Sequence, residues 1–234
     1  MTSNLTKFIL LGVASTAMAT LVGCGGGNSA PVYGLTGVAA TGLAIKQAAV
    51  TVSCLSGSAT STTNDTGFYG VAITNGVGPC LVKVTKGTES YYSIAPDSAT
   101  GSAIANVNQI SNAIVNALVL TKGSGTVDNL VTAAFAPKAA DLDKAVTSTL
   151  AVINALLPFA QQLPSTTNLL GDPAFKAATS TGASDGSALD KALDFLVPAN
   201  STSLPAGLES NINSAVGEVV KPNATGSTGG TSPQ

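Results

Sequence analysis

Histidine, arginine and tryptophan are absent from this 234-residue chain, and charged residues make up only 9% of it. Without histidine, neither a Ser-His-Asp or Cys-His catalytic group nor a histidine-ligated zinc site forms within the chain. The ten basic residues are all lysines, they are scattered, and the formal net charge is −2. Nucleic-acid binding needs a dense basic patch, so no nucleic-acid partner is expected. Catalysis by carboxylates alone is compatible with these absences.

Residues 1–23 have the anatomy of a bacterial signal peptide. A short polar start with Lys7 precedes an uncharged, mostly apolar run over residues 8–23. A membrane-spanning helix needs about 20 predominantly apolar residues, whereas this run is shorter and contains Ser, Thr and Gly. A cleaved signal peptide is therefore favoured over a membrane anchor helix.

The stretch Leu21-Val22-Gly23-Cys24 closes the apolar run and resembles the lipobox of bacterial lipoproteins. The resemblance implies cleavage after Gly23, attachment of diacylglycerol to the Cys24 sulfur and acylation of the new amino terminus. Two or more acyl chains anchor a protein stably, so a membrane of the cell envelope is the expected location. Gly25 stands where an aspartate retains many such proteins in the inner membrane, which favours the outer membrane.

Composition divides the rest of the chain into four parts. Residues 24–31 begin with Cys24 and are glycine-rich, which predicts a flexible tether. Residues 32–98 and 101–221 have different hydrophobic periodicities and predict two folded parts. The Gly/Ser/Thr-rich end, residues 222–234, predicts a disordered tail.

Residues 32–98 contain three segments in which apolar side chains alternate with a period of two, which predicts β-strands. The segments are 49–55, 68–73 and 80–84, with turn-rich stretches between them over 56–67 and 74–79. The alternation gives the inward side chains as Val50, Val52, Cys54, Tyr69, Val71, Ile73, Cys80, Val82 and Val84. Lys83 falls on the opposite face, which is expected to meet solvent. Short strands at this spacing predict an antiparallel β-sandwich.

The order of motifs in this part resembles the carboxypeptidase regulatory-like domain, a small transthyretin-like β-sandwich. The matching positions are Gly37, Val38, Ala48, Val50, Val52, Asp65, Gly67 and Tyr69. The resemblance implies a structural or recognition module and no peptidase activity, because the histidines of the zinc-binding catalytic domain are absent. Asp65 and Gly67 suit a turn, since aspartate bonds nearby amides and glycine adopts positive φ.

Cys54 and Cys80 are the two cysteines besides Cys24, and both fall on inward strand faces. A protein exported from the cytoplasm folds under oxidising conditions, so we predict a disulfide between Cys54 and Cys80. Two buried free thiols that pack as small hydrophobic groups are the alternative.

Residues 101–221 change to the three-and-four spacing of amphipathic helices. Helices are expected over residues 106–120, 128–135, 141–163, 184–197 and 204–220. Asp141 and Asp143 stand at the start of the longest helix, where carboxylates interact favourably with the helix dipole. The whole chain is thus predicted to be α+β, with an N-terminal antiparallel β-sandwich followed by an α-helical region.

Residues 172–198 form a carboxylate-rich stretch that resembles a segment of related bacterial envelope lipoproteins. This resemblance implies no catalytic residue. The matching positions are Phe175, Asp185, Gly186, Asp190, Leu193 and Asp194. With Asp172, these aspartates form the richest acidic cluster in the chain. Asp185, Asp190 and Asp194 are candidate cation ligands or an acid pair for glycoside chemistry. The favoured interpretation is structural: Asp185 caps a helix, and Asp190 and Asp194 form its solvated face beside Lys191.

These observations favour a non-enzymatic, lipid-anchored envelope protein that binds a ligand, an envelope protein or a glycan, or is a structural element. The alternative is a carboxylate-dependent hydrolase of envelope or extracellular glycan. A small-molecule carrier with an apolar pocket between the helices is a third hypothesis. No catalytic residue and no cofactor are expected.

Overall fold

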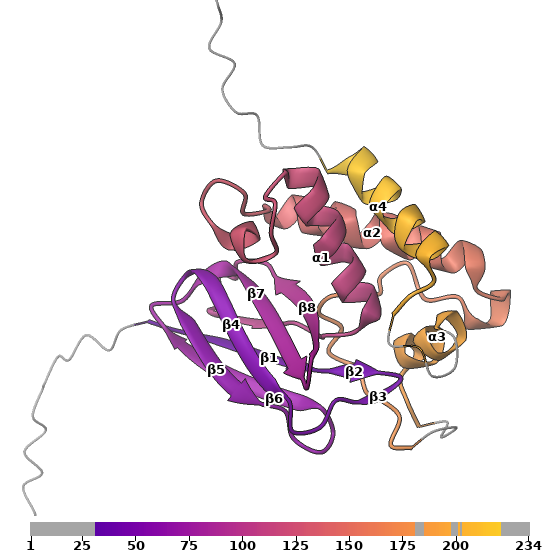
Figure 1. The fold of residues 1–234 in the computed structure, drawn as a ribbon, viewed down its shortest axis with the longest axis horizontal. Helices are drawn as coiled ribbons and strands as arrows, with labels where there is room; N and C mark the ends of the chain where they lie inside the picture. Colours follow the sequence, from indigo (N-terminus) through magenta and orange to yellow (C-terminus); the bar gives the residue numbers. More distant parts are fainter. Residues whose placement is uncertain (1–30, 181–184, 198–200, 202, 221–234) are drawn as a thin grey trace, which may run out of the picture.

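The computed structural model describes residues 31–180, 185–197, 201 and 203–220. In these ranges, two sheets are accompanied by a short hairpin, β2 (Ala40–Thr41) with β3 (Leu43–Ala44) (Figure 1). The first sheet has the order β6 (Phe68–Thr74), β1 (Val32–Val38) and β9 (Ser102–Ile104). The second has the order β5 (Ser58–Thr62), β4 (Ala49–Ser56), β7 (Val77–Lys86) and β8 (Glu89–Ala95).

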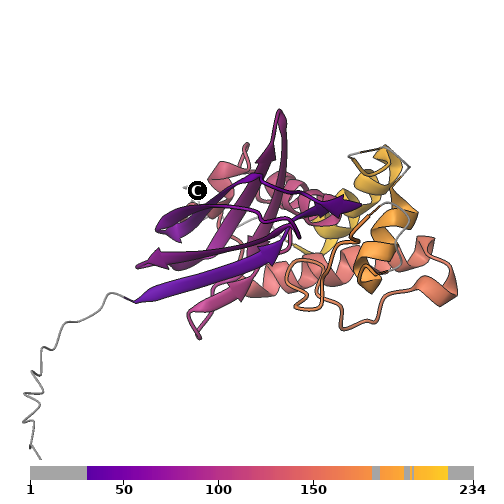
Figure 2. The same ribbon diagram turned by 90° about the horizontal axis from the view of Figure 1, so that it is seen from below.

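Helices follow the strands in the sequence and lie together beside the sheets (Figures 1 and 2). The helices are α1 (Gln109–Lys122), α2 (Ala139–Leu156), α3 (Ala188–Leu196) and α4 (Ala206–Val219), with 3₁₀ turns η1 (Asp128–Val131) and η2 (Phe159–Gln161). This order confirms the predicted α+β fold. None of the helices in the described ranges is long and apolar enough to cross a membrane.

The two sheets bury their facing sides in one apolar core. The predicted inward residues are in or against this core: Val50, Val52, Cys54, Tyr69, Val71, Ile73, Cys80, Val82 and Val84. Except for the parallel pair β1–β9, the neighbouring strands of both sheets are antiparallel. The period-two pattern therefore identified the correct inner face of each strand.

The predicted disulfide between Cys54 and Cys80 is confirmed. The two residues are directly opposite each other on the neighbouring strands β4 and β7. Cys80 is fully buried and Cys54 is partly buried, so the bond lies at the edge of the sandwich core.

Several details of the sandwich differ from the prediction. Strand β7 begins at Val77, inside the stretch 74–79 expected as a turn, and β9 lies in the part 101–221 expected to be helical. The stretch 56–67, expected as a turn, contains strand β5, because its Ser/Thr-rich backbone pairs with β4. In the remaining turn, Asn64 rather than Asp65 bonds the nearby amides: its Oδ1 accepts from Thr66 N at 2.9 Å and Phe68 N at 3.0 Å. Gly67 has the expected positive φ, at 76°.

The helices cover the outer face of the four-stranded sheet. Leu81 of β7 and Ile94 of β8 are buried in the same apolar cluster as Ile110 and Ile114 of α1. The expectation that this face of β7 meets solvent is therefore wrong at Leu81. Lys83 on the same face is partly exposed, with its ammonium 5.8 Å from the centre of the Tyr92 ring. The sheet and the helices thus share one core.

Helix ends differ from the prediction where proline or turn geometry intervenes. The helix expected over 141–163 ends at Leu156. Leu157 is extended because it precedes Pro158, whose ring disfavours a helical residue before it. The helix expected over 128–135 is reduced to the 3₁₀ turn η1.

A four-residue segment, Ala105–Asn108, connects the sandwich to α1 and is buried at every position. Its backbone amides bond to four different acceptors: Thr36 O, Leu170 O, Val38 O and Ser111 Oγ. The Asn106 side chain accepts from Val38 N at 3.1 Å and donates to Asp172 O at 2.7 Å. We call Ala105–Asn108 the junction segment, because it bonds to β1, to α1 and to the loop before α3.

Glycine is required beside the junction segment. A Cβ at Gly37 would lie 1.8 Å from the Ala105 carbonyl oxygen, far inside contact distance. The same oxygen accepts a hydrogen bond from the Tyr69 hydroxyl. The close approach of β1 and the junction segment therefore depends on the missing side chain.

The disulfide gives the first prediction. Replacing both cysteines, Cys54→Ala with Cys80→Ala, should lower the free energy of unfolding by about 3–4 kcal/mol, because the bond closes a 26-residue separation in the unfolded chain. Urea unfolding of the oxidised protein and the variant measures the difference. Equal stabilities, or a mass that reveals two free thiols in the unreduced protein, would contradict it.

Asn106 gives the second prediction. The change Asn106→Ala removes both of its side-chain hydrogen bonds and leaves Val38 N unpaired, which should cost roughly 1–3 kcal/mol. Asp172 O keeps the hydrogen bond from Phe175 N. Asn116→Ala, at an exposed position of α1, is the control and should change stability by less than about 0.5 kcal/mol. Similar urea midpoints for the two variants would show that Asn106 has no special role.

Candidate functional site

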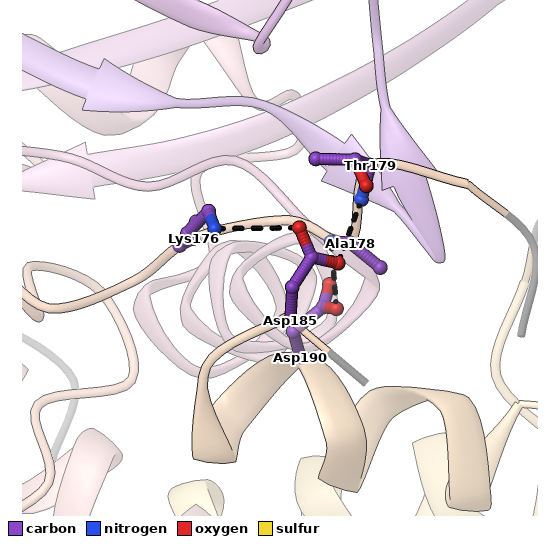
Figure 3. Close-up of polar contacts among 5 residues, drawn as sticks. All are labelled: Lys176, Ala178, Thr179, Asp185 and Asp190. Atoms are coloured by element: carbon purple, nitrogen blue, oxygen red, sulfur yellow. Dashed lines mark hydrogen bonds and ion pairs between the residues drawn. The ribbon is translucent and has the colours of Figure 1, made fainter. Parts of the chain in front are cut away.

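The residues singled out from the sequence fall in three places. Cys24, the proposed lipidation site, lies outside the described residues. Cys54 and Cys80 form the disulfide of the sandwich. The acidic cluster lies between the loop before α3 and α3 itself (Figure 3).

Asp185 bonds to residues of the loop before α3 and does not cap α3. Its Oδ1 accepts from Thr179 N at 3.1 Å, and its Oδ2 lies 3.3 Å from the Lys176 ammonium (Figure 3). The Thr179 hydrogen bond and the Lys176 charge lower the pKa of the Asp185 carboxyl. The predicted cap is wrong because Ser187 occupies the N-cap position and its Oγ accepts from Asp190 N at 3.3 Å.

Asp190 is fully buried, with 0% of its surface exposed, so its predicted place on a solvated face is wrong. Its Oδ2 accepts from Ala178 N at 3.0 Å, which fixes the loop against α3 (Figure 3). Its Oδ1 has no hydrogen-bond partner among the described residues. Burial, with a further contribution from the charges of Asp194 and Asp185, raises the pKa of Asp190 to about 6. Asp194 is exposed, as predicted.

The acidic cluster mainly organises the backbone. Asp185 and Asp190 accept from two successive amides, Thr179 N and Ala178 N. Asp172 also bonds locally, since its Oδ1 accepts from Ala174 N at 2.8 Å. In the part of the chain that the structure describes, no three acidic or cysteine side chains are grouped so that they could hold a metal ion.

A cavity of about 250 Å³ lies where β8, α1 and α4 meet. Glu89 and Glu209, far apart in the sequence, both line it, and so does Gln109 at the start of α1. A shallower depression of about 370 Å³ adjoins it and shares Glu89 and Tyr91. Sequence analysis did not predict this site, because its polar residues belong to no motif and come together only through the packing of the helices on the sheet.

Most of the residues that line the cavity are polar. Besides the two glutamates and Gln109, it includes Ser90, Asn112 and Ser203. A carrier of apolar molecules needs a predominantly hydrophobic pocket. The cavity therefore differs from the apolar pocket of the carrier hypothesis and suits a polar ligand.

Asp190 gives the third prediction. Its pKa is raised from 3.8 to about 6, so protonated Asp190 stabilises the fold at low pH, and this contribution is lost as pH rises through about 6. Asp190→Asn keeps the shape and an acceptor for Ala178 N without the charge. The variant should exceed the parent in stability by roughly 1–3 kcal/mol at about pH 7.5, and by much less near pH 4.

The measurement is urea unfolding of both proteins between about pH 4 and pH 8. Asp143→Asn, at an exposed position of α2, is the control and should leave the pH profile unchanged. A stability difference between Asp190→Asn and its parent that does not vary with pH would contradict the prediction.

No family model, curated protein or solved structure matches this chain. Two resemblances therefore stay predictions. One is that of the sandwich to the carboxypeptidase regulatory-like domain, and the other is that of residues 21–24 to a lipobox.

Proposed function

We propose that this protein is a lipid-anchored component of the bacterial cell envelope that binds a polar ligand or partner without catalysing a reaction. The observation that carries the proposal is Leu21-Val22-Gly23-Cys24 at the end of a short apolar run. Cleavage after Gly23 would make Cys24 the first residue of the mature chain, a few residues before β1 begins at Val32.

The disulfide supports export. Bonds of this kind persist mainly in oxidising compartments, such as the bacterial periplasm and the cell surface. Cys54 and Cys80 pair with each other, so Cys24 is the cysteine available for lipid attachment. Diacylglycerol with amino-terminal acylation would hold the protein stably at a membrane, and Gly25 after the cysteine favours the outer membrane.

The arrangement of the fold suits a binding role. β1 begins at the end of the sandwich that lies away from α3 (Figure 2). A tether that enters β1 there would direct the helical part of the molecule away from the membrane. The polar cavity between β8, α1 and α4 offers a concave site in that helical part.

The glycan-hydrolase alternative has less support from the acidic cluster. Such enzymes need an acid with a raised pKa and a second carboxylate, and both must reach the substrate. Asp190 and Asp185 have pKa values shifted in opposite directions, but Asp190 is fully buried and bonded to Ala178 N. A binding role is therefore favoured over hydrolysis of a glycan, which stays the alternative function.

Lipid attachment is tested by Cys24→Ser in a bacterial host. The variant should move to the aqueous phase in detergent partitioning or accumulate as uncleaved precursor, whereas the parent stays in the detergent phase with a lipid-sized mass increase at its amino terminus. Val22→Ala, at the variable position of the lipobox, is the matched control and should be processed normally. Unchanged partitioning and processing of Cys24→Ser would overturn the assignment.

A further inference from the structure

The cavity between β8, α1 and α4 has the size and the polarity of a small-ligand site. Its volume of about 250 Å³ is near the lower end of the usual range for ligand pockets, so a compact ligand would fill it. Three separate elements provide its walls, and each contributes at least one polar side chain: Glu89 and Ser90 from β8, Gln109 and Asn112 from α1, and Glu209 from α4.

Gln109 lines this cavity and has a buried acceptor without a partner. Only 3% of the residue is exposed, and its Oε1 has no hydrogen-bond partner among the described residues. A buried amide oxygen without a partner is costly, and such groups in native proteins usually bond to a ligand or water. Asn108 and Ser111 form a capping box that fixes the backbone of α1 at this residue. A hydrogen-bond donor in the cavity would satisfy Gln109.

Glu89 and Glu209 add negative charge to the same cavity. Neither carboxylate forms an ion pair within the described ranges. Lys86 is opposite Glu89 in the β7–β8 pair, but its ammonium donates to the Lys46 carbonyl at 2.6 Å. Glu89 does receive one neutral hydrogen bond, from the Tyr91 hydroxyl at 3.2 Å. The lining therefore favours a ligand that carries positive charge.

Asn112 also lines the cavity and adds an amide group to it. Its Oδ1 accepts from Tyr92 N at 3.2 Å, so its Nδ2 is the group left to bond a ligand. Nδ2 is a donor, which suits a hydroxyl oxygen better than a second ammonium group. The side chains thus offer carboxylate and amide acceptors together with one amide donor.

We propose that this cavity binds a small organic ammonium compound that also carries hydroxyl groups, of about the size of one amino sugar. Its ammonium bonds to Glu209, Glu89 and the Gln109 Oε1, and a hydroxyl accepts from Asn112. The proposal deepens the binding role given above and rests on it, but it does not depend on the lipid anchor.

The test uses glucosamine as the probe and glucose as its uncharged counterpart. Each sugar is titrated into the full chain by calorimetry at about pH 6, where the amine is protonated. Glucosamine should bind and glucose should bind at least about tenfold more weakly. Absence of glucosamine binding, or equal affinity for the two sugars, would overturn the proposal.

Two variants locate the binding. Glu209→Gln should weaken glucosamine binding about tenfold by removing one charge without loss of volume. Glu218→Gln, at an exposed position of the same helix that does not line the cavity, is the matched control and should bind like the parent. Equal affinities for the two variants would overturn the assignment to this cavity.

A third variant tests Gln109 directly. Gln109→Leu should weaken binding while the far-UV circular dichroism spectrum stays that of the folded parent, and unchanged affinity in this variant would remove Gln109 from the site.

Cys24→Ser separates the two proposals. Loss of anchoring with glucosamine binding retained is the expected result. Correct anchoring without glucosamine binding would leave the envelope assignment in place and refute the ligand.

Discussion

The structure depends on the burial of the junction segment, Ala105–Asn108, and on the hydrogen bonds of its four backbone amides. A buried amide without a partner costs about as much as a lost hydrogen bond, so a segment without regular structure is buried only where partners surround it. Here the partners come from β1, from α1 and from the loop before α3. Because β1 and the loop before α3 are far apart in the sequence, the segment completes its bonds only when the sandwich and that loop are both in place.

This constraint explains why the two parts predicted from hydrophobic periodicity pack together around a shared apolar cluster. The outer face of the four-stranded sheet would expose Leu81 and Ile94 if the sandwich stood alone. The junction segment leads directly into α1, which packs on β8, while η1 packs on β7. The polar cavity is a consequence of the same packing, since its walls belong to the sheet and to two helices. A binding site of this kind keeps its shape only if the sheet and the helices do not separate.

The sequence predicted those features that depend on local pattern. Alternation identified the inner faces of three strands, and through them the pairing of Cys54 with Cys80. Three-and-four spacing located the main helices. Pattern alone missed the burial of Asp190, because an aspartate one turn from Asp194 has the spacing of a solvated pair. Its burial follows from the loop that packs on α3, which no periodicity encodes.

The cavity was beyond prediction for a related reason. Nothing in the sequence links Glu89 to Glu209, and they line one cavity only because α4 packs beside α1, which packs on β8. In the sequence, Gln109 is an ordinary residue of the helix expected over 106–120. Its unsatisfied amide is recognisable only when its surroundings are known. The spacing of residues in a sequence does not reveal a site that is assembled by tertiary packing and contains no motif.

The central claim is that sandwich and helices form a single cooperative unit held by the junction segment. Native-state hydrogen exchange in increasing denaturant tests it most directly, because it reports the opening free energy of each amide. The account predicts that the most protected amides of β4, β7 and α1 converge on one free energy with one dependence on denaturant. Exchange of the α1 amides through a separate opening of lower free energy, while β4 and β7 stay protected, would contradict it.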